Sequence, residues 1–448
     1  MKPNTPKPAR AALGVPLFAL GIALFALNGF GGLWPRGDKR GINNLPRIAA
    51  AALPSDELAH QRAIQFLTTR VARDPDDFRS QNMLAGRYLQ RLRETSDVED
   101  LSLALRAAHA SLRAVDAREN AGGLTVLVMA EQSGHEFGAA RQNALRLTQL
   151  LPTKSGSYAL LGDALLELGD YDGAAKSFAR MEKLGGGGET RLARLDTLRG
   201  APEKSAVRLS NALALALDAP SPNRETVAWC RWQLGETAFS VGDIPSAENF
   251  YNDALTTYPH YFRALASLGR ARAALGDLPG AIENYEKAVA IVPDPAFLSA
   301  LGDLYQLSGR PRDAAAKYRL VEVIGHLSAV SGALYNRQLA LFYADHDLKP
   351  QIAYGQARRE YALRRDIYGA DALAWTALKA GHLQEAQTAI KNALRLGTRD
   401  AKLFYHAGMI ARAAGDSNGA RDYLQRTLDL NAHFDPLQAE IARKALAE

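Results

Sequence analysis

The stretch that decides the fold runs from Trp232 to Pro259 and reads WQLGETAFSVGDIPSAENFYNDALTTYP. A close copy, ASLGRARAALGDLPGAIENYEKAVAIVP, follows from Ala266 to Pro293, so the pattern returns after 34 residues. Small residues at shared positions allow two helices to cross closely, and a tyrosine fills the space between them. A proline then ends the second helix. Each unit is therefore predicted to be a helical hairpin, which buries its apolar stripes only by stacking on further hairpins.

The spacing and the order of Gly, Ala, Tyr, Ala and Pro resemble the tetratricopeptide repeat (TPR), a helical hairpin of this length. The resemblance implies an all-α fold, a right-handed superhelical solenoid of about eight or nine TPR hairpins between Ser55 and Glu448, preceded by one N-terminal hydrophobic helix. The C-terminal third resembles a bacterial TPR family without an assigned activity. The expected turn glycines are Gly134, Gly169, Gly242, Gly276, Gly309, Gly381 and Gly415.

Changes in glycine, proline and charge content divide the chain into seven segments. The hinge is inferred from the glycine run at 185–188 and from DAPSPN at 218–223. The capping helix is inferred from Asp435 as its N-cap and Pro436 at its first position. The segments are a basic N-terminal tail at 1–10, a transmembrane anchor or signal sequence at 11–33, a linker at 34–54, an N-terminal TPR array at 55–188, a degenerate repeat and hinge at 189–223, a C-terminal TPR array at 224–435 and a capping helix at 436–448.

The N-terminal segment predicts where the protein resides. Lys2, Lys7 and Arg10 precede an uncharged run from Ala11 to Leu33, which is long enough to span a hydrocarbon core of about 30 Å. No small-residue cleavage site follows the apolar core directly, which favours an uncleaved anchor. We therefore expect a single-pass inner-membrane protein with periplasmic repeats. The alternative is a protein secreted to the periplasm after signal cleavage.

Composition and motifs argue against several functional classes. The net charge of +6 comes without a dense Lys/Arg run, so we expect no nucleic-acid partner. The glycine run at 185–188 lacks the Lys-Ser/Thr of a phosphate loop. The single cysteine, Cys230, excludes an intramolecular disulfide and is interpreted as a small buried residue. We expect no enzyme, no catalytic residue, no cofactor, no metal and no small-molecule substrate.

One turn offers a competing hypothesis. Asp345, His346 and Asp347 are adjacent and could coordinate a cation in a metal-binding protein or an enzyme. Three adjacent residues of one turn rarely point at a single ion, which favours a solvated loop.

The TPR resemblance also implies a binding surface, because the first helix of each hairpin in that family lines the concave face. Aromatic and arginine side chains dominate binding hot spots, so we expect this face to bind an acidic and hydrophobic segment of a protein or peptide. The alternative is that some of these residues, Trp375 especially, seal neighbouring hairpins. The expected groove residues are Trp229, Trp232, Glu236, Phe239, Arg263, Arg270, Asp303, Gln306, Arg337, Tyr368, Asp371, Trp375, Tyr405, Met409 and Arg412.

These features together predict a non-enzymatic scaffold or adaptor, anchored to the membrane through residues 11–33, that binds a protein or peptide during assembly of an envelope complex. The alternative is a glycan-export or secretion component that docks on a channel. No sequence feature separates these two roles. An Asn at the ninth groove position is absent from every clear repeat, which disfavours a two-carboxylate clamp for acidic C-terminal peptides.

Overall fold

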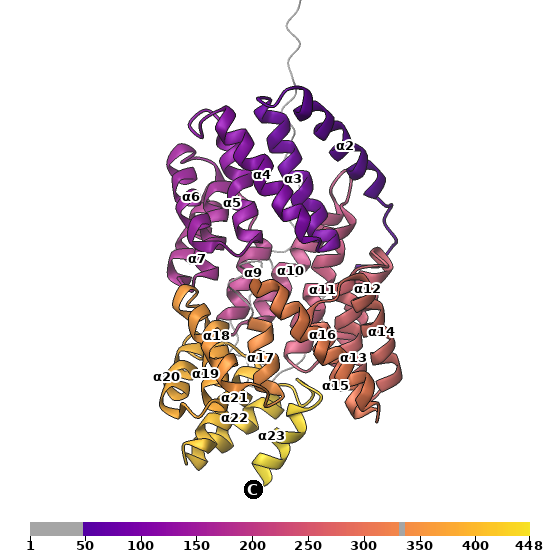
Figure 1. Ribbon diagram of the computed structural model, residues 1–448, viewed down its shortest axis with the longest axis vertical. Helices are drawn as coiled ribbons and strands as arrows, with labels where there is room; N and C mark the ends of the chain where they lie inside the picture. Colours follow the sequence, from indigo (N-terminus) through magenta and orange to yellow (C-terminus); the bar gives the residue numbers. More distant parts are fainter. Residues whose placement is uncertain (1–47, 331–336) are drawn as a thin grey trace, which may run out of the picture. The chain divides into compact units, whose positions relative to one another are not determined.

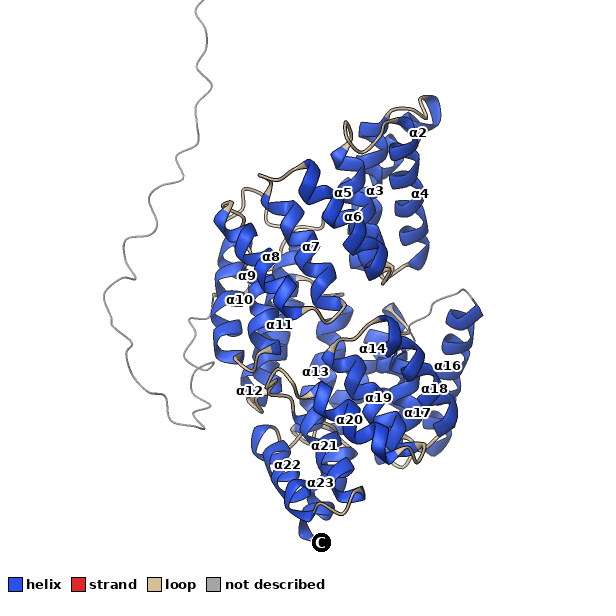
Figure 2. Ribbon diagram, turned by 90° about the vertical axis from the view of Figure 1, so that its left-hand side faces the viewer, coloured by secondary structure: helices blue, strands red, loops and turns tan. Residues whose placement is uncertain are grey.

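The computed structural model describes residues 48–330 and 337–448, and within these residues it contains helices and loops but no strand (Figures 1 and 2). The predicted N-terminal tail and hydrophobic helix, and most of the linker, lie outside the described residues. No helix of the part that is described has the length and apolar character needed to cross a membrane. The helices are α2 (Glu57–Arg73), α3 (Phe78–Thr95), α4 (Val98–Ala114), α5 (Ala121–Ser133), α6 (Phe137–Leu150), α7 (Ser155–Glu167), α8 (Tyr171–Lys183), α9 (Glu189–Leu198), α10 (Pro202–Leu217), α11 (Arg224–Ser240), α12 (Ile244–Thr257), α13 (Phe262–Ala274), α14 (Leu278–Ile291), α15 (Pro295–Leu307), α16 (Pro311–Val330), α17 (Arg337–Asp345), α18 (Pro350–Leu363), α19 (Ile367–Lys379), α20 (Leu383–Ala393), α21 (Ala401–Ala413), α22 (Ser417–Leu430) and α23 (Gln438–Ala447).

Consecutive helices of the described chain pair into ten hairpins, from α3–α4 to α21–α22, with α2 before them and α23 after them. The predicted all-α array is confirmed, but the expected eight or nine hairpins were too few, because segments with weak repeat signatures also form hairpins. Residues 189–223 are one such segment and contain the hairpin α9–α10. A hinge at this place stays a prediction.

A glycine in the first helix of the hairpin sets how closely the two helices cross. A Cβ atom at Gly235 would lie 2.4 Å from the ring of Tyr251, which is completely buried. A Cβ atom at Gly302 would lie 2.3 Å from the Tyr318 ring. The expectation that an aromatic side chain fills the space between the helices is confirmed. The same contact joins Gly162 to Phe178 and Gly269 to Tyr285.

The turn of a typical hairpin consists of a left-handed glycine followed by a capping aspartate. Gly242 has φ 78°, a region in which a side chain would be strained. The Asp243 carboxylate accepts a hydrogen bond from the Ser246 N–H at 3.2 Å and thereby caps α12. The turn between α5 and α6 differs, because Gly134 has φ −84° and His135 takes the left-handed conformation at φ 61°.

The array coils back on itself, so that hairpins 196 residues apart along the chain touch. All described residues belong to one compact unit, 39–448. We call α2–α14 the first coil and α15–α23 the second coil. Turns of three hairpins in the first coil pack against loops of the second coil so closely that a Cβ on the turn glycine would meet a backbone carbonyl oxygen at 2.3, 2.3 and 2.7 Å. The contacting pairs are Gly169 with Arg365, Gly200 with Gly397, and Gly242 with Leu430.

Side chains of the second coil also complete hydrogen bonding at helix ends of the first. The Thr398 hydroxyl donates to the carbonyl of Leu198, the last residue of α9. The Asn431 amide donates to the carbonyl of Phe239 at 2.7 Å, near the end of α11. The last carbonyls of a helix have no intrahelical partner, so Thr398 supplies a donor for the Leu198 carbonyl. The Phe239 carbonyl accepts from Asn431 in addition to the Gly242 N–H of its own turn, at 3.0 Å.

The predicted capping helix corresponds to α23. The Asp435 carboxylate accepts hydrogen bonds from the N–H groups of Leu437 and Gln438 at 2.9 and 2.8 Å, but the N-cap residue of α23 is Leu437 and not Asp435 as the sequence suggested. The helix itself begins at Gln438, two residues later than the Pro436 start that the sequence suggested.

Candidate partner-binding cavity

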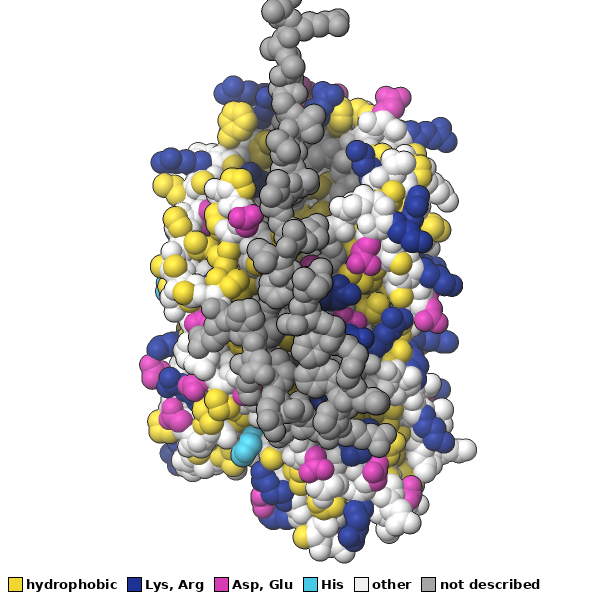
Figure 3. Space-filling model, turned by 180° about the vertical axis from the view of Figure 1, so that it is seen from behind, with side chains coloured by type: hydrophobic (Ala, Val, Ile, Leu, Met, Phe, Trp, Pro, Cys, Tyr) yellow, Lys and Arg dark blue, Asp and Glu magenta, His cyan; other side chains and the backbone are white. Residues whose placement is uncertain are grey.

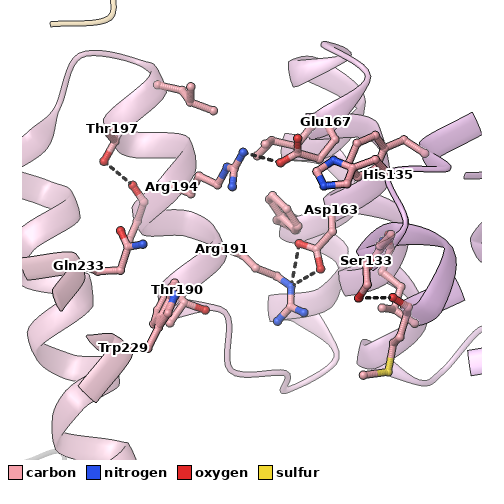
Figure 4. A pocket seen from close by; sticks show the side chains of 18 of the residues that line it. Ser133, His135, Asp163, Glu167, Thr190, Arg191, Arg194, Thr197, Trp229 and Gln233 are labelled. Carbon is pink, nitrogen blue, oxygen red and sulfur yellow. Dashed lines mark hydrogen bonds and ion pairs between the residues drawn. The ribbon is translucent and has the colours of Figure 1, made fainter. Parts of the chain in front are cut away.

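A cavity of about 850 Å³ lies between the two coils (Figure 4). The first helices α5, α7, α9 and α11 supply most of its wall, so it faces the inner side of the first coil. Apolar side chains such as Leu89, Met129 and Leu209 share the lining with polar and charged ones. The second coil contributes Arg364 and Tyr368, so the wall is complete only where the two coils meet.

Arginine–carboxylate pairs cross the cavity wall from helix to helix. Arg191 on α9 donates from Nε to both carboxylate oxygens of Asp163 on α7, at 2.9 Å each. Arg194, one turn later, donates to Glu167 at the end of α7. Figure 4 shows both guanidinium groups directed at these carboxylates. Burial raises the pKa of Asp163, and the positive charge of Arg191 opposes this effect.

Arg364 joins the second coil to this network. Its Nη2 donates to the Glu167 carboxylate and its Nε donates to the Glu167 carbonyl at 3.1 Å. The guanidinium group lies 4.8 Å from the centre of the Phe137 ring, which His135 meets edge-on at 5.5 Å. Burial and the charge of Arg364 lower the pKa of His135, so this imidazole is neutral at neutral pH. Arg364 thus places a paired cation at the junction of the coils.

Two of the predicted groove residues line this cavity. Trp229 projects from α11 together with Gln233, one turn later, and Tyr368 projects from α19. Trp229 and Tyr368 are both partly exposed. Burial of the Tyr368 phenol raises its pKa, so the phenol remains protonated and can donate a hydrogen bond. These side chains give the cavity aromatic surface beside polar groups.

Other predicted groove residues are buried between neighbouring hairpins. The indole of Trp375 stacks on His406 with ring centroids 4.3 Å apart and donates its N–H to Asp345 at 2.8 Å. First helices of adjacent hairpins pack directly on each other, so side chains at these positions fill the interface instead of facing a groove. They therefore offer little accessible surface to a partner. The buried residues, with their exposed fractions, are Phe239 (5%), Asp303 (9%), Asp371 (6%), Trp375 (2%) and Tyr405 (2%).

Trp232, Glu236 and Arg270 form a network between two hairpins. The Trp232 indole N–H donates to the Ser267 hydroxyl at 2.9 Å. The Glu236 carboxylate accepts from Ser267 at 2.8 Å, from Arg270 at 2.6 Å and from Tyr251 at 2.7 Å. Burial acts to raise the pKa of Glu236, but Arg270 and these hydrogen bonds hold it below its usual value. The expected cationic surface is therefore neutralised at Arg270.

Arg337 is likewise an interior residue, with 15% of its side chain exposed. It pairs with Glu360 at 2.5 Å and with Asp366 at 2.7 Å. Burial acts to lower the pKa of Arg337, but the two carboxylates raise it, so the charge is retained. Its contacts join α17 to α18 and to the start of α19.

The remaining predicted groove residues lie away from the cavity lining. Arg263 lies 4.6 Å from the centre of the Phe262 ring. Gln306 and Arg412 are exposed, Met409 is partly exposed, and Arg412 pairs with the C-terminal Glu448 side chain. Their role in binding stays a prediction.

The three side chains of the Asp345–Asp347 turn bind separate partners. His346 Nε2 lies 2.7 Å from Asp303, and Asp347 accepts from Lys379 at 2.6 Å. Asp345 accepts from Lys402 at 3.0 Å as well as from Trp375. The turn therefore does not gather three ligands around one ion.

A different group, Asp56, His60 and Glu94, brings potential metal-ligating atoms within 4.8 Å of one another. The two ring nitrogens of His60 face different carboxylates, Nε2 towards Asp56 and Nδ1 towards Glu94, each at 3.5 Å. Arg224 also lies 3.4 Å from Asp56. Because one ion binds one ring nitrogen and Arg224 already supplies positive charge, this group is better suited to internal ion pairing.

Sequence reasoning did not identify Asp163, Arg191, Arg194 and Arg364 as cavity residues. Asp163 follows Gly162 just as Glu236 follows Gly235, so the repeat register could have placed it on the inner face. Arg191 and Arg194 belong to the segment interpreted as a degenerate repeat, to which no register was assigned. Arg364 lies in a loop, and only the contact between the coils brings it to the cavity.

Charged side chains on one outer face of the described chain are mixed in sign. On the uncovered part of the face seen in Figure 3, Lys and Arg side chains alternate with Asp and Glu, and apolar side chains lie among them. The cavity is thus distinguished from that face by its depth.

Comparisons with known proteins agree with the repeat architecture. Family models described as tetratricopeptide repeat match residues 155–182, 233–296 and 372–433. No curated protein matches the chain at a significant level.

Solved structures to which this chain is similar include the MamA protein, yeast Tom70 and Pseudomonas aeruginosa pilF. For MamA the TM-score is 0.30 at 21% identity, over 39% of this chain and 93% of that chain. For Tom70 the TM-score is 0.35 at 14% identity, over 87% of this chain and 93% of that chain. For pilF the TM-score is 0.27 at 20% identity, over 48% of this chain and 99% of that chain.

The 34-residue spacing, the glycine–aromatic contact inside the hairpins and the family-model matches lead to one assignment. The chain contains tetratricopeptide repeats, at residues 155–182, 233–296 and 372–433.

Proposed function

We propose that this protein is a non-enzymatic adaptor that binds a segment of a protein partner in the cavity between its two coils. Tetratricopeptide repeat proteins generally mediate protein–protein interactions. The single observation that carries the proposal is the cavity of about 850 Å³, which combines Trp229 and Tyr368 with the ion pairs of Asp163 and Glu167. Aromatic anchors beside oriented polar groups are typical of binding hot spots.

The paired arginines change the kind of partner that we expect. Arg191, Arg194 and Arg364 already contact carboxylates, so an acidic segment would have to displace Asp163 or Glu167 from them. We propose that the partner segment inserts apolar side chains beside Trp229 and makes hydrogen bonds to the edges of these ion pairs. Fixed ion pairs then contribute to specificity more than to affinity.

We further propose that residues 11–33 anchor the protein in the inner membrane and that the repeats assemble an envelope complex on the periplasmic side. The support is the uncharged run of the sequence behind three basic residues. A reporter fused after Glu448 tests the orientation, and sequencing of the mature N-terminus tests whether the segment is retained.

Site-specific photo-crosslinking in cells tests the cavity. A photoreactive amino acid at Gln233 lies in the cavity, whereas the same group at Asn252, on the other helix of the same hairpin, lies on an exposed outer face. We expect a discrete crosslinked protein from position 233 and its loss when Trp229→Ala is added. Equal products from both positions, or none from position 233, would contradict the proposal. A channel protein among the products would favour the docking role.

A further inference from the structure

One helix of the second coil carries a row of exposed apolar side chains. Leu320, Val323 and Leu327 on α16 are 38%, 53% and 58% exposed, and Ala316 before them is exposed as well. We call these four residues the α16 row. A different face of the helix already packs on the array through Val321, which is completely buried. Figure 2 shows α16 at an edge of the described chain.

The repeat register shows that hairpin packing does not require the α16 row. Tyr318 of α16 and Tyr285 of α14 hold the same repeat position, 33 residues apart. The positions equivalent to the start of the row are mostly polar in the two preceding hairpins. They are Glu283, Lys287 and Ala290 in α14, and Asn249, Asp253 and Thr256 in α12. Helices at this place therefore pack into the array with a polar outer face, so apolar side chains gathered there on α16 point to a further contact.

The spacing of the α16 row is that of the apolar seam of a coiled coil. Its members follow one another at intervals of four, three and four residues, which correspond to positions d, a, d and a of a heptad. At about 100° per residue the four side chains fall within an arc of about 60°. A helix that packs on a globular core uses a wider stripe of about 100° or more, whereas the narrow seam accepts one other helix.

Positive charges flank the α16 row. Arg312 and Arg319 hold g positions of the heptad, and Lys317 holds an e position. Within the described chain these three side chains form no ion pair. The acidic residues of α16 are instead neutralised by cations from outside the helix, so the flanks of the row are left positive. The pairs are Asp313 with Arg310 at 2.7 Å and Glu322 with Lys349 at 2.6 Å.

We propose that the α16 row binds a single α-helix of another protein, whose own apolar seam is flanked by Asp and Glu. Apolar side chains at a and d supply the buried contact, and opposite charges at e and g set the choice and orientation of the partner. No residue of the α16 row lines the cavity, so this contact is separate from the one proposed there.

The same features argue against two other occupants. A second copy of this chain, paired through its own α16, would place Arg312, Arg319 and Lys317 against like charges. An anionic membrane surface would attract the cations, but helices that lie on membranes bury a broad apolar face, not a seam as narrow as this one.

Two synthetic helical peptides serve as probes of the full chain. Both carry Leu at every a and d position over about three heptads, and they differ only in having Glu or Lys at e and g. By fluorescence anisotropy at low salt, we expect the Glu peptide to bind at least about tenfold more tightly than the Lys peptide. The preference should shrink at high salt, because salt screens charges at the edge of an interface.

Variants of α16 locate the binding of the peptides. Val323→Asn should weaken binding of the Glu peptide at least about tenfold, because it places an amide in the middle of the seam. Arg319→Glu should move the preference towards the Lys peptide. Leu145→Asn, which changes an apolar side chain that is 50% exposed on α6, is the matched control and should leave binding unchanged. All three variants should keep the unfolding midpoint of wild type, because the side chains are exposed.

Photo-crosslinking in cells identifies the natural occupant. A photoreactive amino acid replaces Val323 and, in the control, Thr256, its equivalent on α12. We expect a product from position 323 alone, joined to a heptad helix with Asp or Glu at e and g, and unchanged by Trp229→Ala. No product at 323, or crosslinks to a second copy, to residues 1–47 or to lipid, would overturn the proposal. Equal binding of the two peptides, or full binding by Val323→Asn, would do the same.

Discussion

The backbone N–H of Ile367 donates a 2.9 Å hydrogen bond to the hydroxyl of Tyr171, 196 residues earlier in the chain. Ile367 is the first residue of α19, where N–H groups lack an acceptor inside their own helix. Tyr171 is the first residue of α8 and is 5% exposed. Burial raises the pKa of its phenol, which keeps the donor and acceptor functions of the hydroxyl intact. A side chain of the first coil thus satisfies the first backbone N–H of α19 in the second coil.

Tyr171→Phe should destabilise the protein without a change of shape. The substitution removes the acceptor and leaves the buried N–H of Ile367 unsatisfied, which costs about 1–3 kcal/mol. Urea denaturation followed by circular dichroism measures the loss. Tyr158→Phe is the matched control, because its hydroxyl makes an exposed hydrogen bond to Pro152 at 3.2 Å. Equal midpoints for the two variants would show that the coils do not depend on this contact.

Gly235→Ala should be destabilising although alanine favours helices. The new Cβ would lie 2.4 Å from the fully buried Tyr251 ring, so the two helices of the hairpin must separate. Overpacking of this kind costs about 1–3 kcal/mol. Gly355→Ala, in the middle of α18, meets only the end of the Arg359 side chain at 3.8 Å and should stabilise by about 0.5–1 kcal/mol. The opposite order of the two unfolding midpoints would refute the close crossing of α11 and α12.

Arg337→Met should cost about 3–5 kcal/mol, because it leaves the buried Glu360 without its cation and leaves Asp366 with Arg364 alone, at 3.2 Å. Glu360 and Asp366 are 3% and 6% exposed at their side chains. Arg310→Met removes the exposed partner of Asp313 and should leave the unfolding midpoint almost unchanged. If Arg337→Met were as stable as wild type, Arg337 would be a surface residue, as the sequence suggested.

The His346–Asp303 contact predicts a pH-dependent contribution to stability. Burial acts to lower the pKa of His346, but the hydrogen bond to Asp303 and its charge raise it overall. The contribution is therefore complete below the unfolded pKa of about 6.5 and is lost as the pH rises through the higher folded pKa. The stability difference between wild type and His346→Gln should be larger at about pH 5.5 than at about pH 9. His326→Gln, at an exposed position, is the control, and a difference that grows with pH would contradict the assignment.

The sequence predicts the hairpins well because their determinants are local. Gly235, Gly242 and Tyr251 recur at fixed spacing, and each shapes its own hairpin. Gly235 allows the two helices to cross closely, and Tyr251 fills the space between them. Gly242 adopts the left-handed conformation that the turn requires. Such constraints are visible in a single repeat.

The cavity was less predictable because it depends on contacts between distant repeats. Trp375 and Trp232 occupy inner-face positions by register, yet one is buried against His406 and the other bonds Ser267 of the next hairpin. How tightly adjacent hairpins curve decides whether such side chains face solvent, and no single repeat encodes that curvature. Arg364 reaches the cavity only because the array returns on itself.

The contact between the two coils completes the cavity wall, and hydrogen exchange at one amide tests this contact most directly. The Ile367 amide, resolved by NMR of the full chain, should exchange far more slowly than an exposed helix-start amide, and Tyr171→Phe should remove most of that protection. Rapid exchange at Ile367 in wild type, or protection that survives in Tyr171→Phe, would contradict the contact.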